Sequence, residues 1–550
     1  MKVVLLGINA SWTHSCLALY YLRNAIADLD YEAEIIELTL KQNLSETLET
    51  IYKSKPDVLC LSVYIWNVEY IKQIVPEVRK LLSETTIVAG GPEISFNPNT
   101  YDKIKPDYLI KGYGEDAFKT LAQEQFNKSE KVMQGTPIPL KDIPFPYQES
   151  DLQQLKHKMI YYEASRGCAC KCIYCLSSRD ELMDWLPEER VKTDIDKLLV
   201  FNPKVIKFVD RSFNQKKEWA RAIWKYVIGL DTTVPFHFEV HPDWLEAEDI
   251  AILSKAPKGR MQLEIGIQSI HKQTLKLISR PSDWNKVKAN LQALKAETNI
   301  PLHTDLIVGL PNENQQQIID SINEVLLAYP DELQLGFLKI LQGTQMAENA
   351  KELKYIYADI APYTVLQTPD LSFEDVLHFE KLSLILNQYW NKGDFLTVWR
   401  KALAWREPYQ CMEELLQYNL KSDNQLHSID RLKRFELMAD WITQEWSGEE
   451  HAYLVDALRW DWCRKAGEAW FPDVIKSEVS LNFRKEHYTE IVDWLKSEYW
   501  QNEDWNMKRF IVFSATSNAF ALDYLEGYTK AVFVSCKNEE NAIVIYKKQC

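Results

Sequence analysis

The sequence predicts an α/β protein in three parts: a doubly wound, Rossmann-like N-terminal domain, a central partial barrel of six β/α units, and a mainly helical C-terminal domain with a small terminal sheet. Three observations predict this class. The 550 residues suggest about three domains, and the hydrophobic fraction of 46% can fill their cores. Strand and helix patterns alternate in two successive series. Beyond about residue 355 the apolar residues repeat with a helical period.

The first series covers residues 1–125, which we take as the first domain. Apolar runs of strand length lie at residues 3–8, 33–38, 58–64, 86–89 and 108–110, with helical patterns at 16–29 and 68–82. Buried strands that alternate with helices form a parallel, doubly wound sheet, whose ligand binds beyond the carboxyl ends of the strands. The sequence has no G-x-G-x-x-G after the first strand and no Walker A motif, so neither nucleotide-binding fingerprint is present.

The loops that follow these strands are therefore candidate ligand-binding segments. They read NASWTHS, IWN, GGPE and GYGE along the chain. Glycine lets the backbone approach a large ligand closely. For His14, in the first of these loops, we expect a hydrogen-bonding role rather than metal ligation. The candidate binding residues of the first domain are Asn9, Trp66, Asn67, Gly90, Gly91, Gly112 and Gly114.

Residues 126–154 form the predicted boundary between the first two domains. They include TPIPLKDIPFPY, which has four prolines in twelve residues. A proline-rich segment of this kind favours an extended, semi-rigid connector over a helix.

The second series, residues 155–355, predicts a partial barrel. Six strands are expected at residues 159–163, 205–209, 236–240, 262–267, 303–308 and 334–340. Barrel enzymes carry their chemistry on the loops at the carboxyl ends of the strands. The first strand leads into EASRGCACKCIYCLSS, which contains four of the ten cysteines of the chain.

Within this loop Cys168, Cys172 and Cys175 form C-x-x-x-C-x-x-C. Three such thiolates can hold three irons of a cubane cluster and leave the fourth iron open for a ligand. Cys170 is surplus to this motif, and we interpret it as a spectator thiol.

Other interpretations of these cysteines are weaker. A structural zinc site needs two separated ligand pairs, and no second C-x-x-C occurs. His237 and His241 lie in a predicted strand, where their rings would be roughly 13 Å apart, too far to share a metal. A disulfide is disfavoured because the other cysteines are scattered and the cytosol is the expected compartment.

Residues 356–550 are expected to form the third domain. Helical patterns lie at residues 372–391, 394–404, 429–443, 452–466 and 484–499, and short strands at 509–513, 531–535 and 542–546. The frequent Trp and Tyr residues of this part are best explained by packing. Its cysteines are isolated, which gives no support to an auxiliary cluster: Cys411, Cys463, Cys536 and Cys550.

Composition excludes some partners. A net charge of −15 argues against a broad phosphate-binding surface, so nucleic acid is not an expected partner. The N-terminal MKVVLLGIN lacks a basic region and a cleavage site, and we interpret it as a strand rather than a signal peptide. No run of about 18 apolar residues occurs, so we expect no membrane span and a cytoplasmic protein.

The cysteine motif, with Tyr174 just before the last cysteine, resembles the signature of radical S-adenosylmethionine (radical SAM) enzymes. The resemblance implies a 4Fe–4S cluster on Cys168, Cys172 and Cys175. Its open iron would be chelated by the methionine moiety of S-adenosylmethionine, and Tyr174 would pack near the adenine. It also implies a 5′-deoxyadenosyl radical and an electron donor such as flavodoxin or ferredoxin.

Later strand ends extend this resemblance. EIGIQS with Arg280, TDLIVGLP and LKILQGT resemble segments of coproporphyrinogen-oxidase-like radical SAM domains. The customary Gly-Gly-Glu after the second strand is replaced by Asp210-Arg211-Ser212, which makes Asp210 the candidate for the amino group of the methionine. Gly309 would leave backbone room near the adenine. The resemblance implies further contacts to S-adenosylmethionine from Glu239, Gln268, Arg280 and Asp305.

The first domain resembles the cobalamin-binding domain that precedes many radical SAM domains, through its A-G-G-P and G-Y-G-E loops. The D-x-H-x-x-G motif is absent, so the resemblance implies cobalamin without supporting a histidine ligand to cobalt. The stretch from residues 361–363 to 387–391 resembles an uncharacterised C-terminal domain of one cobalamin-type radical SAM subfamily. Such a module is expected to close the barrel mouth.

These resemblances imply methyl transfer, through methylcobalamin, to an unactivated carbon or phosphorus of a small-molecule or peptide substrate. Relatives of this architecture also perform cyclisations and rearrangements, with or without bound cobalamin. Two alternatives stay open: a radical SAM enzyme whose first domain is a vestigial docking module, and a non-catalytic sensor of cobalamin or an iron–sulfur cluster.

Overall fold

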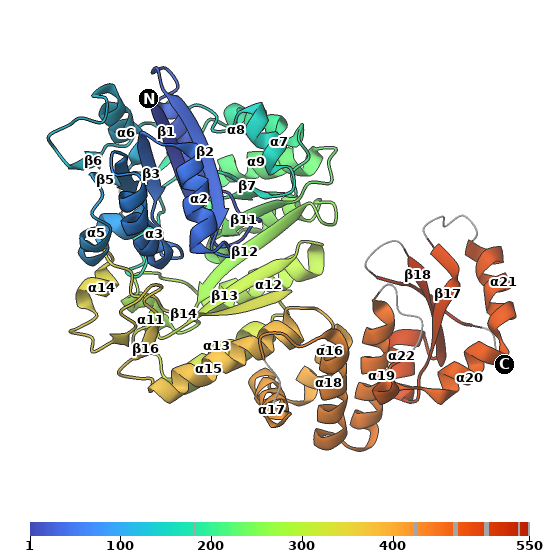
Figure 1. Cartoon of the computed structure of the whole chain (residues 1–550). Helices are drawn as coiled ribbons and strands as arrows, with labels where there is room; N and C mark the ends of the chain where they lie inside the picture. The colour runs from blue at the N-terminus through green and yellow to red at the C-terminus, as the bar shows by residue number, and fades with distance from the viewer. Residues whose placement is uncertain (180–181, 423–425, 466–470, 500–504, 537–539, 548–550) are drawn as a thin grey trace. The chain divides into compact units, whose positions relative to one another are not determined.

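The computed structural model describes residues 1–179, 182–422, 426–465, 471–499, 505–536 and 540–547 (Figure 1). Cys550 and Ala466, the predicted end of a helix, lie outside these residues. The chain divides into two units. The first contains Met1–Ser321, Ala328–Pro330 and Leu335–Val376, and the second contains Ile322–Leu327, Asp331–Gln334 and Leu377–Cys550.

The first unit begins with a six-stranded sheet in the order β2-β1-β3-β4-β5-β6, and every neighbouring pair is parallel. The strand order reverses between β1 and β3, which is where doubly wound sheets bind their ligands. The strands are Lys2–Asn9 (β1), Glu32–Thr39 (β2), Val58–Ser62 (β3), Thr86–Gly90 (β4), Tyr108–Gly112 (β5) and Val132–Gly135 (β6). The helices are Leu17–Ala25 (α1), Leu44–Ser54 (α2), Val68–Leu81 (α3), Pro92–Phe96 (α4), Pro98–Ile104 (α5) and Gly114–Gln123 (α6).

Alternate residues of each strand fill two separate cores, one on each face of the sheet. On β1, Leu6 packs with residues of α2, α3, α4 and α5, whereas Leu5 packs with residues of α1 and α6. Strands that are apolar on both faces give the continuous hydrophobic runs that predicted this sheet.

The sixth strand was not predicted. β6 lies in the stretch that we expected to be only an extended connector, and it pairs with β5 at the edge of the sheet. Only Met133 and Gly135 of its four residues are buried, so the run is too short and too polar to be recognised without its partner. The connector also contains a 3-10 turn, Leu140–Asp142, and a helix, Glu149–Leu155 (α7).

The second sheet has the predicted six strands, in the order β14-β13-β12-β11-β10-β7, and the neighbouring pairs from β7 to β13 are parallel. The strands are Met159–Tyr162 (β7), Val205–Phe208 (β10), Phe236–Val240 (β11), Met261–Gln268 (β12), Leu302–Val308 (β13) and Glu332–Phe337 (β14). The helices are Glu188–Leu199 (α8), Lys217–Gly229 (α9), Ala247–Leu253 (α10), Lys272–Leu277 (α11), Trp284–Glu297 (α12), Gln315–Leu326 (α13) and Gln345–Asn349 (α14). Short pieces are Leu176–Arg179, Phe213–Gln215, Pro242–Trp244, Ser165–Arg166 (β8), Asp184–Trp185 (β9), Ile356–Tyr357 (β15) and Val365–Gln367 (β16).

The two faces of this second sheet differ. Phe208 and Phe238 stack on one face and contact Phe213, which packs against Trp219 and Trp224 of α9. The alternate positions on the other face carry polar side chains, as in the sequence MQLEIGIQ of β12, whose burial alternates residue by residue. The barrel interior is therefore polar where barrel cores are usually filled with branched apolar residues.

The second unit is mainly helical with a three-stranded antiparallel sheet in the order β17-β18-β19, as predicted. Helices Pro408–Lys421 (α17) and Asn518–Leu525 (α22) were not predicted, and the helix predicted at residues 484–499 is two helices. The other helices are Phe373–Ile385 (α15), Leu396–Trp405 (α16), Arg431–Glu445 (α18), Gly448–Arg464 (α19), Glu478–Glu486 (α20) and Tyr488–Tyr499 (α21), with a π-helical turn at Leu386–Trp390 and a 3-10 turn at Asp473–Ile475. The strands are Trp505–Ser514 (β17), Lys530–Cys536 (β18) and Ala542–Ile545 (β19).

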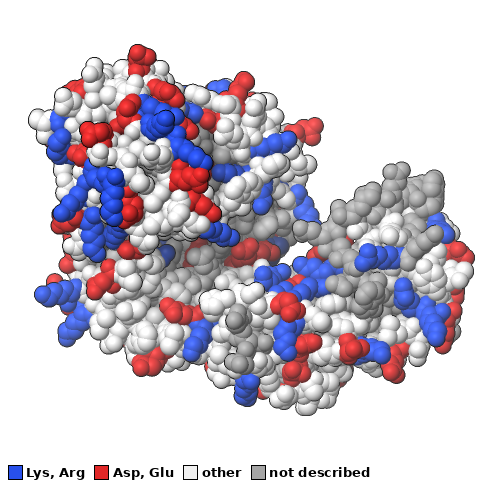
Figure 2. Space-filling view, viewed as in Figure 1, with Lys and Arg blue, Asp and Glu red and all other residues white. Residues whose placement is uncertain are grey.

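Among the described residues, no helix is both long and apolar enough to span a membrane. On the face of the molecule shown in Figure 2, Lys and Arg side chains are interspersed with Asp and Glu.

Candidate functional site

The cysteine loop leaves the barrel after β7 and is closed by a small antiparallel ladder. Ser165 and Arg166 of β8 pair with Trp185 and Asp184 of β9. Gly167 follows with φ +88°, and a Cβ at this position would lie 1.9 Å from the carbonyl oxygen of Leu182. The sharp turn before the first cysteine therefore requires glycine.

The three cysteines of the motif lie on this loop near two polar side chains. Cys168 and Cys172 are buried, and Cys175 is partly exposed. Ser212 lies 3.6 Å from the sulfur of Cys168, and Arg280 donates from Nη1 to the sulfur of Cys172 at 3.7 Å.

The thiols of Cys168 and Cys172 are acidic. A hydrogen bond from Cys170 is the largest cause that lowers the pKa of Cys168 and of Cys172 to about 6 each; Ser212 assists at Cys168 and Arg280 at Cys172. The same contacts raise the pKa of Cys170. Thiolates are the form that binds iron, so the donor chemistry fits a cluster held by Cys168, Cys172 and Cys175. In the described part of the chain, no three His, Cys, Asp or Glu side chains gather around a single-ion site.

Arg280 also contacts the carboxyl end of β12. Its Nη2 donates to the carbonyl oxygen of Gly266 at 2.8 Å. The register with β13 shifts between Gly266 and Gln268, and Gln268 has φ +70°. A Cβ on Gly266 would lie 2.3 Å from Nε2 of Gln268 and 3.4 Å from Nη2 of Arg280. Glycine at this position makes room for the side chain of Gln268.

Glu239 and Asp305 lie on the interior strands beside this bulge. Glu239 is opposite Glu264, and Asp305 is opposite Gly266. Burial raises the pKa of Glu239 to about 7, although Arg211 opposes the shift. Burial also raises the pKa of Asp305, against a hydrogen bond from His303. The carboxyl group of Glu239 can therefore accept or donate a hydrogen bond near neutral pH.

The loops of the first domain lie at the carboxyl ends of β1, β3, β4 and β5. Asn67 is buried and donates to the carbonyl oxygens of Ile8 and Ser62. Trp66 donates to the same oxygen of Ile8 at 3.2 Å, stacks on Tyr64, and leaves 46% of its surface exposed.

Asn9 and the glycines complete this edge. Asn9 donates to the carbonyl oxygen of His14 at 3.1 Å. Gly91 has φ +105°, and a Cβ there would lie 2.5 Å from the carbonyl oxygen of Val63. Gly112 has φ +74°. Gly90 ends β4 and Gly114 begins α6.

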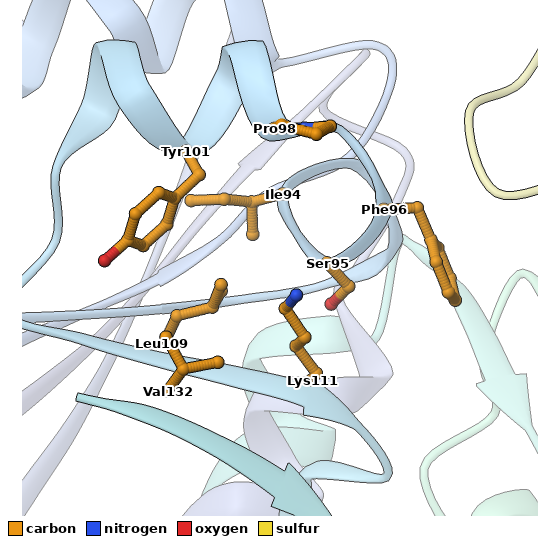
Figure 3. Close-up of a pocket in the computed structure, with 8 residues that line it drawn as sticks. All are labelled: Ile94, Ser95, Phe96, Pro98, Tyr101, Leu109, Lys111 and Val132. Atoms are coloured by element: carbon orange, nitrogen blue, oxygen red, sulfur yellow. The ribbon is translucent and has the colours of Figure 1, made fainter. Parts of the chain in front are cut away.

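A cavity of about 180 Å³ is lined by residues of α4, α5, β5 and β6 (Figure 3). The side chains of Ser95 and Lys111 supply polar groups to a mainly apolar lining, and Tyr101 closes one side. The remaining lining residues are Ile94, Phe96, Pro98, Leu109 and Val132.

Family comparisons match all three parts of the chain. The B12 binding domain matches residues 3–122, and the radical SAM superfamily matches residues 162–325. The chain therefore contains a B12-binding domain followed by a radical SAM domain. Residues 351–546 match a protein family of unknown function, DUF4080. The family predicted from the cysteine motif and the glycine loops is therefore confirmed.

Two curated methyltransferases are similar to this chain. The chain is 23% identical over 371 residues to the cobalamin-dependent radical SAM methyltransferase TokK of Streptomyces tokunonensis, which covers 59% of this chain and 53% of the relative. It is 24% identical over 317 residues to the 2-(S-pantetheinyl)-carbapenam-3-carboxylate methyltransferase of Streptantibioticus cattleyicolor, covering 50% of this chain and 45% of the relative. The chain thus spans about half the length of these relatives.

Solved structures share the fold. The radical enzyme OxsB with aqua-cobalamin bound covers 89% of this chain and 81% of its own, with a TM-score of 0.57 and 14% identity. The methyltransferase TsrM from Kitasatospora setae, with cobalamin and a [4Fe-4S] cluster bound, covers 66% of this chain and 76% of its own, with a TM-score of 0.53 and 14% identity. The predicted fold class is confirmed.

Within the radical SAM domain, Asp210 makes contacts that differ from the predicted one. Its buried carboxylate accepts from the backbone N–H of Ala164 at 3.2 Å and from the hydroxyl of Ser165. Burial raises the pKa of Asp210 to about 7, although both hydrogen bonds oppose the shift. Asp210 therefore supports the base of the cysteine loop, and its contact to a methionine amino group stays a prediction.

Tyr174 and Gly309 both lie beside the same hydrophobic cluster. Tyr174 packs against a cluster that includes Ile173, Leu338 and Val365. Gly309 has φ +93°, and a Cβ there would lie 2.7 Å from Cγ1 of Val365. Tyr174 is thus held beside Cys172, and burial raises its pKa.

Sequence reasoning missed a polar row deeper in the barrel. Oε2 of Glu264 lies 3.0 Å from Nζ of Lys207 and 3.2 Å from Nε2 of His237. Although burial opposes it, these contacts lower the pKa of Glu264 to about 2. The period-two alternation in FHFEV and MQLEIGIQ was the signal that could have identified an inward polar face.

Glu313 was also missed. It is buried after β13 and accepts from the hydroxyl of Ser269 at 2.5 Å, which joins the carboxyl-end loops of β12 and β13. Burial raises its pKa to about 7, against the Ser269 hydrogen bond. Its position two residues after the GLP of TDLIVGLP was the sequence signal that could have identified it.

Two loops of the B12-binding domain contact later parts of the same unit: the first loop contacts β7, and the loop after β4 contacts Tyr363, which lies in the segment matched by DUF4080. Nδ1 of His14 lies 2.6 Å from the hydroxyl of Tyr161 on β7. The hydroxyl of Tyr363 donates to Oε1 of Glu93 at 2.5 Å, in the loop after β4. His14 thus makes the kind of hydrogen bond that was predicted.

Proposed function

We propose that this chain is a radical SAM enzyme that holds a 4Fe–4S cluster on Cys168, Cys172 and Cys175 and cobalamin on its B12-binding domain. It transfers a methyl group to an unactivated carbon or phosphorus centre of a small-molecule or peptide substrate. The observation that carries the proposal is the pair of acidic, buried thiols of Cys168 and Cys172 on the first barrel loop, with Arg280 beside Cys172. The named activity of the curated relatives supports methyl transfer.

When bound, the cluster and S-adenosylmethionine supply a 5′-deoxyadenosyl radical, and cobalamin supplies a carrier for the methyl group. The protein supplies position and electrostatics. The guanidinium of Arg280 is fixed by the carbonyl of Gly266, and it offers a charged donor to the carboxylate of S-adenosylmethionine. Gln268, Glu239 and Asp305 offer hydrogen-bonding groups to its hydroxyl and amino groups.

Glu239 can form hydrogen bonds to a ligand in either of its protonation states near neutral pH. Because burial raises the pKa of this carboxyl group to about 7, it can donate a hydrogen bond to a ligand group when it is protonated and accept one when it is ionised. Asp210 acts indirectly, because it accepts hydrogen bonds from the backbone N–H of Ala164 and the hydroxyl of Ser165 at the base of the cysteine loop. Tyr174 and its apolar neighbours exclude water beside Cys172.

Reduction of the cluster requires a one-electron donor. We propose a small redox protein of the flavodoxin or ferredoxin type, and a cytoplasmic location in which such a donor is kept reduced. A low-potential iron–sulfur site functions only under reducing conditions.

The test is anaerobic reconstitution of the whole chain with iron, sulfide and cobalamin. We expect the cluster to give a broad charge-transfer band in the visible region, and bound corrin to absorb after free cobalamin has been removed. We also expect the reduced protein to cleave S-adenosylmethionine to 5′-deoxyadenosine. Transfer of a labelled methyl group from S-adenosylmethionine to the bound, reduced corrin tests the methyl-transfer part.

The variant Cys172→Ala is expected to lose the cluster and the cleavage, whereas Cys170→Ala is expected to keep both. Cleavage by Cys172→Ala would contradict the cluster assignment. Cleavage by the wild type without any bound corrin would favour a vestigial first domain, and bound cofactors without cleavage would favour a sensor.

A further inference from the structure

One buried guanidinium joins the base of the cysteine loop to the B12-binding domain. Nη2 of Arg166 donates to Oε1 of Glu115 at 2.5 Å, and Nε donates to Oε2 of Glu163 at 3.0 Å. The side chains of Arg166, Glu115 and Glu163 expose only 12%, 10% and 17% of their surfaces. Glu115 belongs to the B12-binding domain, and Glu163 directly follows β7.

Two aromatic rings of the B12-binding domain hold the same guanidinium. Its carbon lies 5.6 Å from the ring centre of Tyr21 on α1 and 5.5 Å from that of Tyr113. Both distances are within the range of cation–π attraction. Arg166 therefore contacts α1, the loop after β5 and the first turn of α6 at once.

Both ends of this connection are stiff. On one side, only Gly167 separates Arg166 from Cys168, and the β8–β9 ladder fixes Arg166 itself. On the other side, Tyr113 lies between Gly112 and Gly114, and a Cβ on Gly135 would lie 1.5 Å from its carbonyl oxygen. A displacement at Arg166 would therefore move both loops.

We propose that Arg166 is a positioning residue that fixes the cysteine loop relative to the glycine loop after β5, and thereby sets the separation between the iron–sulfur cluster and the corrin. This inference rests on the proposed function, because it assigns the two cofactors to these two loops. It adds a residue that neither binds iron nor contacts the corrin but determines how they face each other.

The chemistry of the contact explains why arginine is required. One planar cation meets two carboxylates and two rings, which the compact ammonium of lysine cannot do in a single geometry. Removing one partner of such a buried pair leaves an uncompensated charge. In group transfer a misplacement of about 1 Å can reduce the rate on the order of 100-fold.

The test uses the full chain, reconstituted anaerobically, as wild type, Arg166→Lys and Glu115→Gln. A matched control is Arg221→Lys, because Arg221 is also a buried guanidinium with carboxylate partners, Asp249 and Glu246, on the outer helices. The readouts are iron and corrin content, the electron paramagnetic resonance of the cob(II)alamin form with the cluster reduced, and hydrogen exchange of the apo protein at residues 112–118 and 164–169.

We expect Arg166→Lys and Glu115→Gln to keep iron and corrin within about twofold of wild type but to change the magnetic broadening of the cobalt signal by the cluster. Hydrogen exchange should rise together in both segments. Methyl transfer from S-adenosylmethionine to the corrin should fall on the order of 10–100-fold, as for other supporting residues of metal sites. Arg221→Lys should leave all of these readouts unchanged.

The two variants disturb the contact in different ways. Glu115→Gln keeps the size of the side chain but removes its negative charge, whereas Arg166→Lys keeps the positive charge but removes the planar guanidinium. If both match Arg221→Lys in the cobalt signal and in hydrogen exchange, Arg166 has no positioning role. Loss of iron alone, with exchange unchanged at residues 112–118, would also overturn the inference. A wild-type protein that binds no corrin would instead overturn the proposed function, and the inference with it.

Discussion

Arg280 donates from Nη1 to the sulfur of Cys172 across 3.7 Å, although the two residues are 108 positions apart in the chain. The same guanidinium donates to the carbonyl oxygen of Gly266. The first barrel loop and the bulged end of β12 are therefore joined through one cation. The contact makes the thiol of Cys172 more acidic and fixes a charged donor beside it.

The first prediction concerns Gly266→Ala. The new Cβ would lie 2.3 Å from Nε2 of Gln268, so that side chain must move, whereas its distance of 3.4 Å from Nη2 of Arg280 is close to an ordinary contact. We expect the affinity for S-adenosylmethionine to fall by roughly 10-fold, because the orientation of the Gln268 amide is lost, while the iron content stays near that of wild type. Equilibrium binding to the reconstituted protein measures the change.

The matched control is Gly229→Ala at the end of α9, where a Cβ would meet nothing within 4 Å. Its affinity for S-adenosylmethionine should equal that of wild type. Equal affinities for the Gly266→Ala protein and this control would contradict a contact between Gln268 and the ligand.

Local patterns were sufficient to predict much of this molecule. The strands β10 to β13 were predicted because each is a run of apolar residues at alternate or successive positions, and strand pairing then follows from their order. The cysteine motif was predicted because its ligands lie within eight residues of one another. A site built from neighbours along the chain leaves a signal in the sequence.

Contacts between distant residues leave no such signal. Glu115 and Arg166 are 51 positions apart, and nothing in either local sequence identifies the other as its partner. β6 exists because β5 offers it an edge, so its four residues could not predict it. The interaction of Asp210 with Ala164 and Ser165 likewise depends on the packing of β10 beside β7.

The second prediction concerns pH and Glu313. Burial raises the pKa of this carboxyl group to about 7, from about 4.3 in an unfolded chain. Between these values the folded protein binds more protons than the unfolded one, so the stabilising contribution is complete below about pH 4.3 and is lost as the pH rises through 7. We expect the melting temperature of the apo protein to fall over this window.

Glu313→Gln should flatten that dependence, because glutamine keeps an acceptor for Ser269 but cannot ionise. At pH 8 we expect the variant to melt about 1–3 °C above wild type. Thermal scans from pH 5 to pH 8 measure the slope. A slope that is unchanged in the variant would mean that Glu313 does not titrate with the folded state.

The third prediction concerns Asp461 in the second unit. This buried carboxylate accepts from the backbone N–H groups of Thr397 (3.1 and 2.9 Å) and Val398 (3.1 Å), at the start of α16. Asp461→Ala leaves two buried donors without their acceptor, each of which costs about 1–3 kcal/mol. We expect the unfolding free energy of this unit to fall by about 2–4 kcal/mol.

Urea unfolding followed by tryptophan fluorescence measures this loss, since Trp399 and Trp441 are buried in the same unit. Asp430→Ala is the control, because Asp430 caps α18 with a hydrogen bond to the N–H of Lys433 in an exposed position. Its substitution should cost about 1 kcal/mol. Equal losses for the two variants would contradict a special role of the buried aspartate.

The fourth prediction concerns the polar row inside the barrel. Lys207 and Glu264 lie on β10 and β12, on either side of β11, and their charged atoms are 3.0 Å apart. Their side chains expose 22% and 27% of their surfaces, so water screens the pair only in part. Lys207→Met leaves Glu264 with His237 as its neighbour, and Glu264→Gln leaves Lys207 without an anion.

We expect each single variant to lower the unfolding free energy of the apo protein by about 1–2 kcal/mol, which is less than for a fully buried pair. The double variant Lys207→Met with Glu264→Gln should recover part of the loss, giving a coupling free energy of about 1 kcal/mol. Denaturant unfolding of the four proteins completes the cycle. The exposed pair Lys53 and Glu49 provides the matched comparison, with a coupling of about 0.3–0.5 kcal/mol. If the interior pair coupled no more strongly than this surface pair, the row would be a hydrated lining of the barrel rather than a set of ion pairs that stabilises its strands.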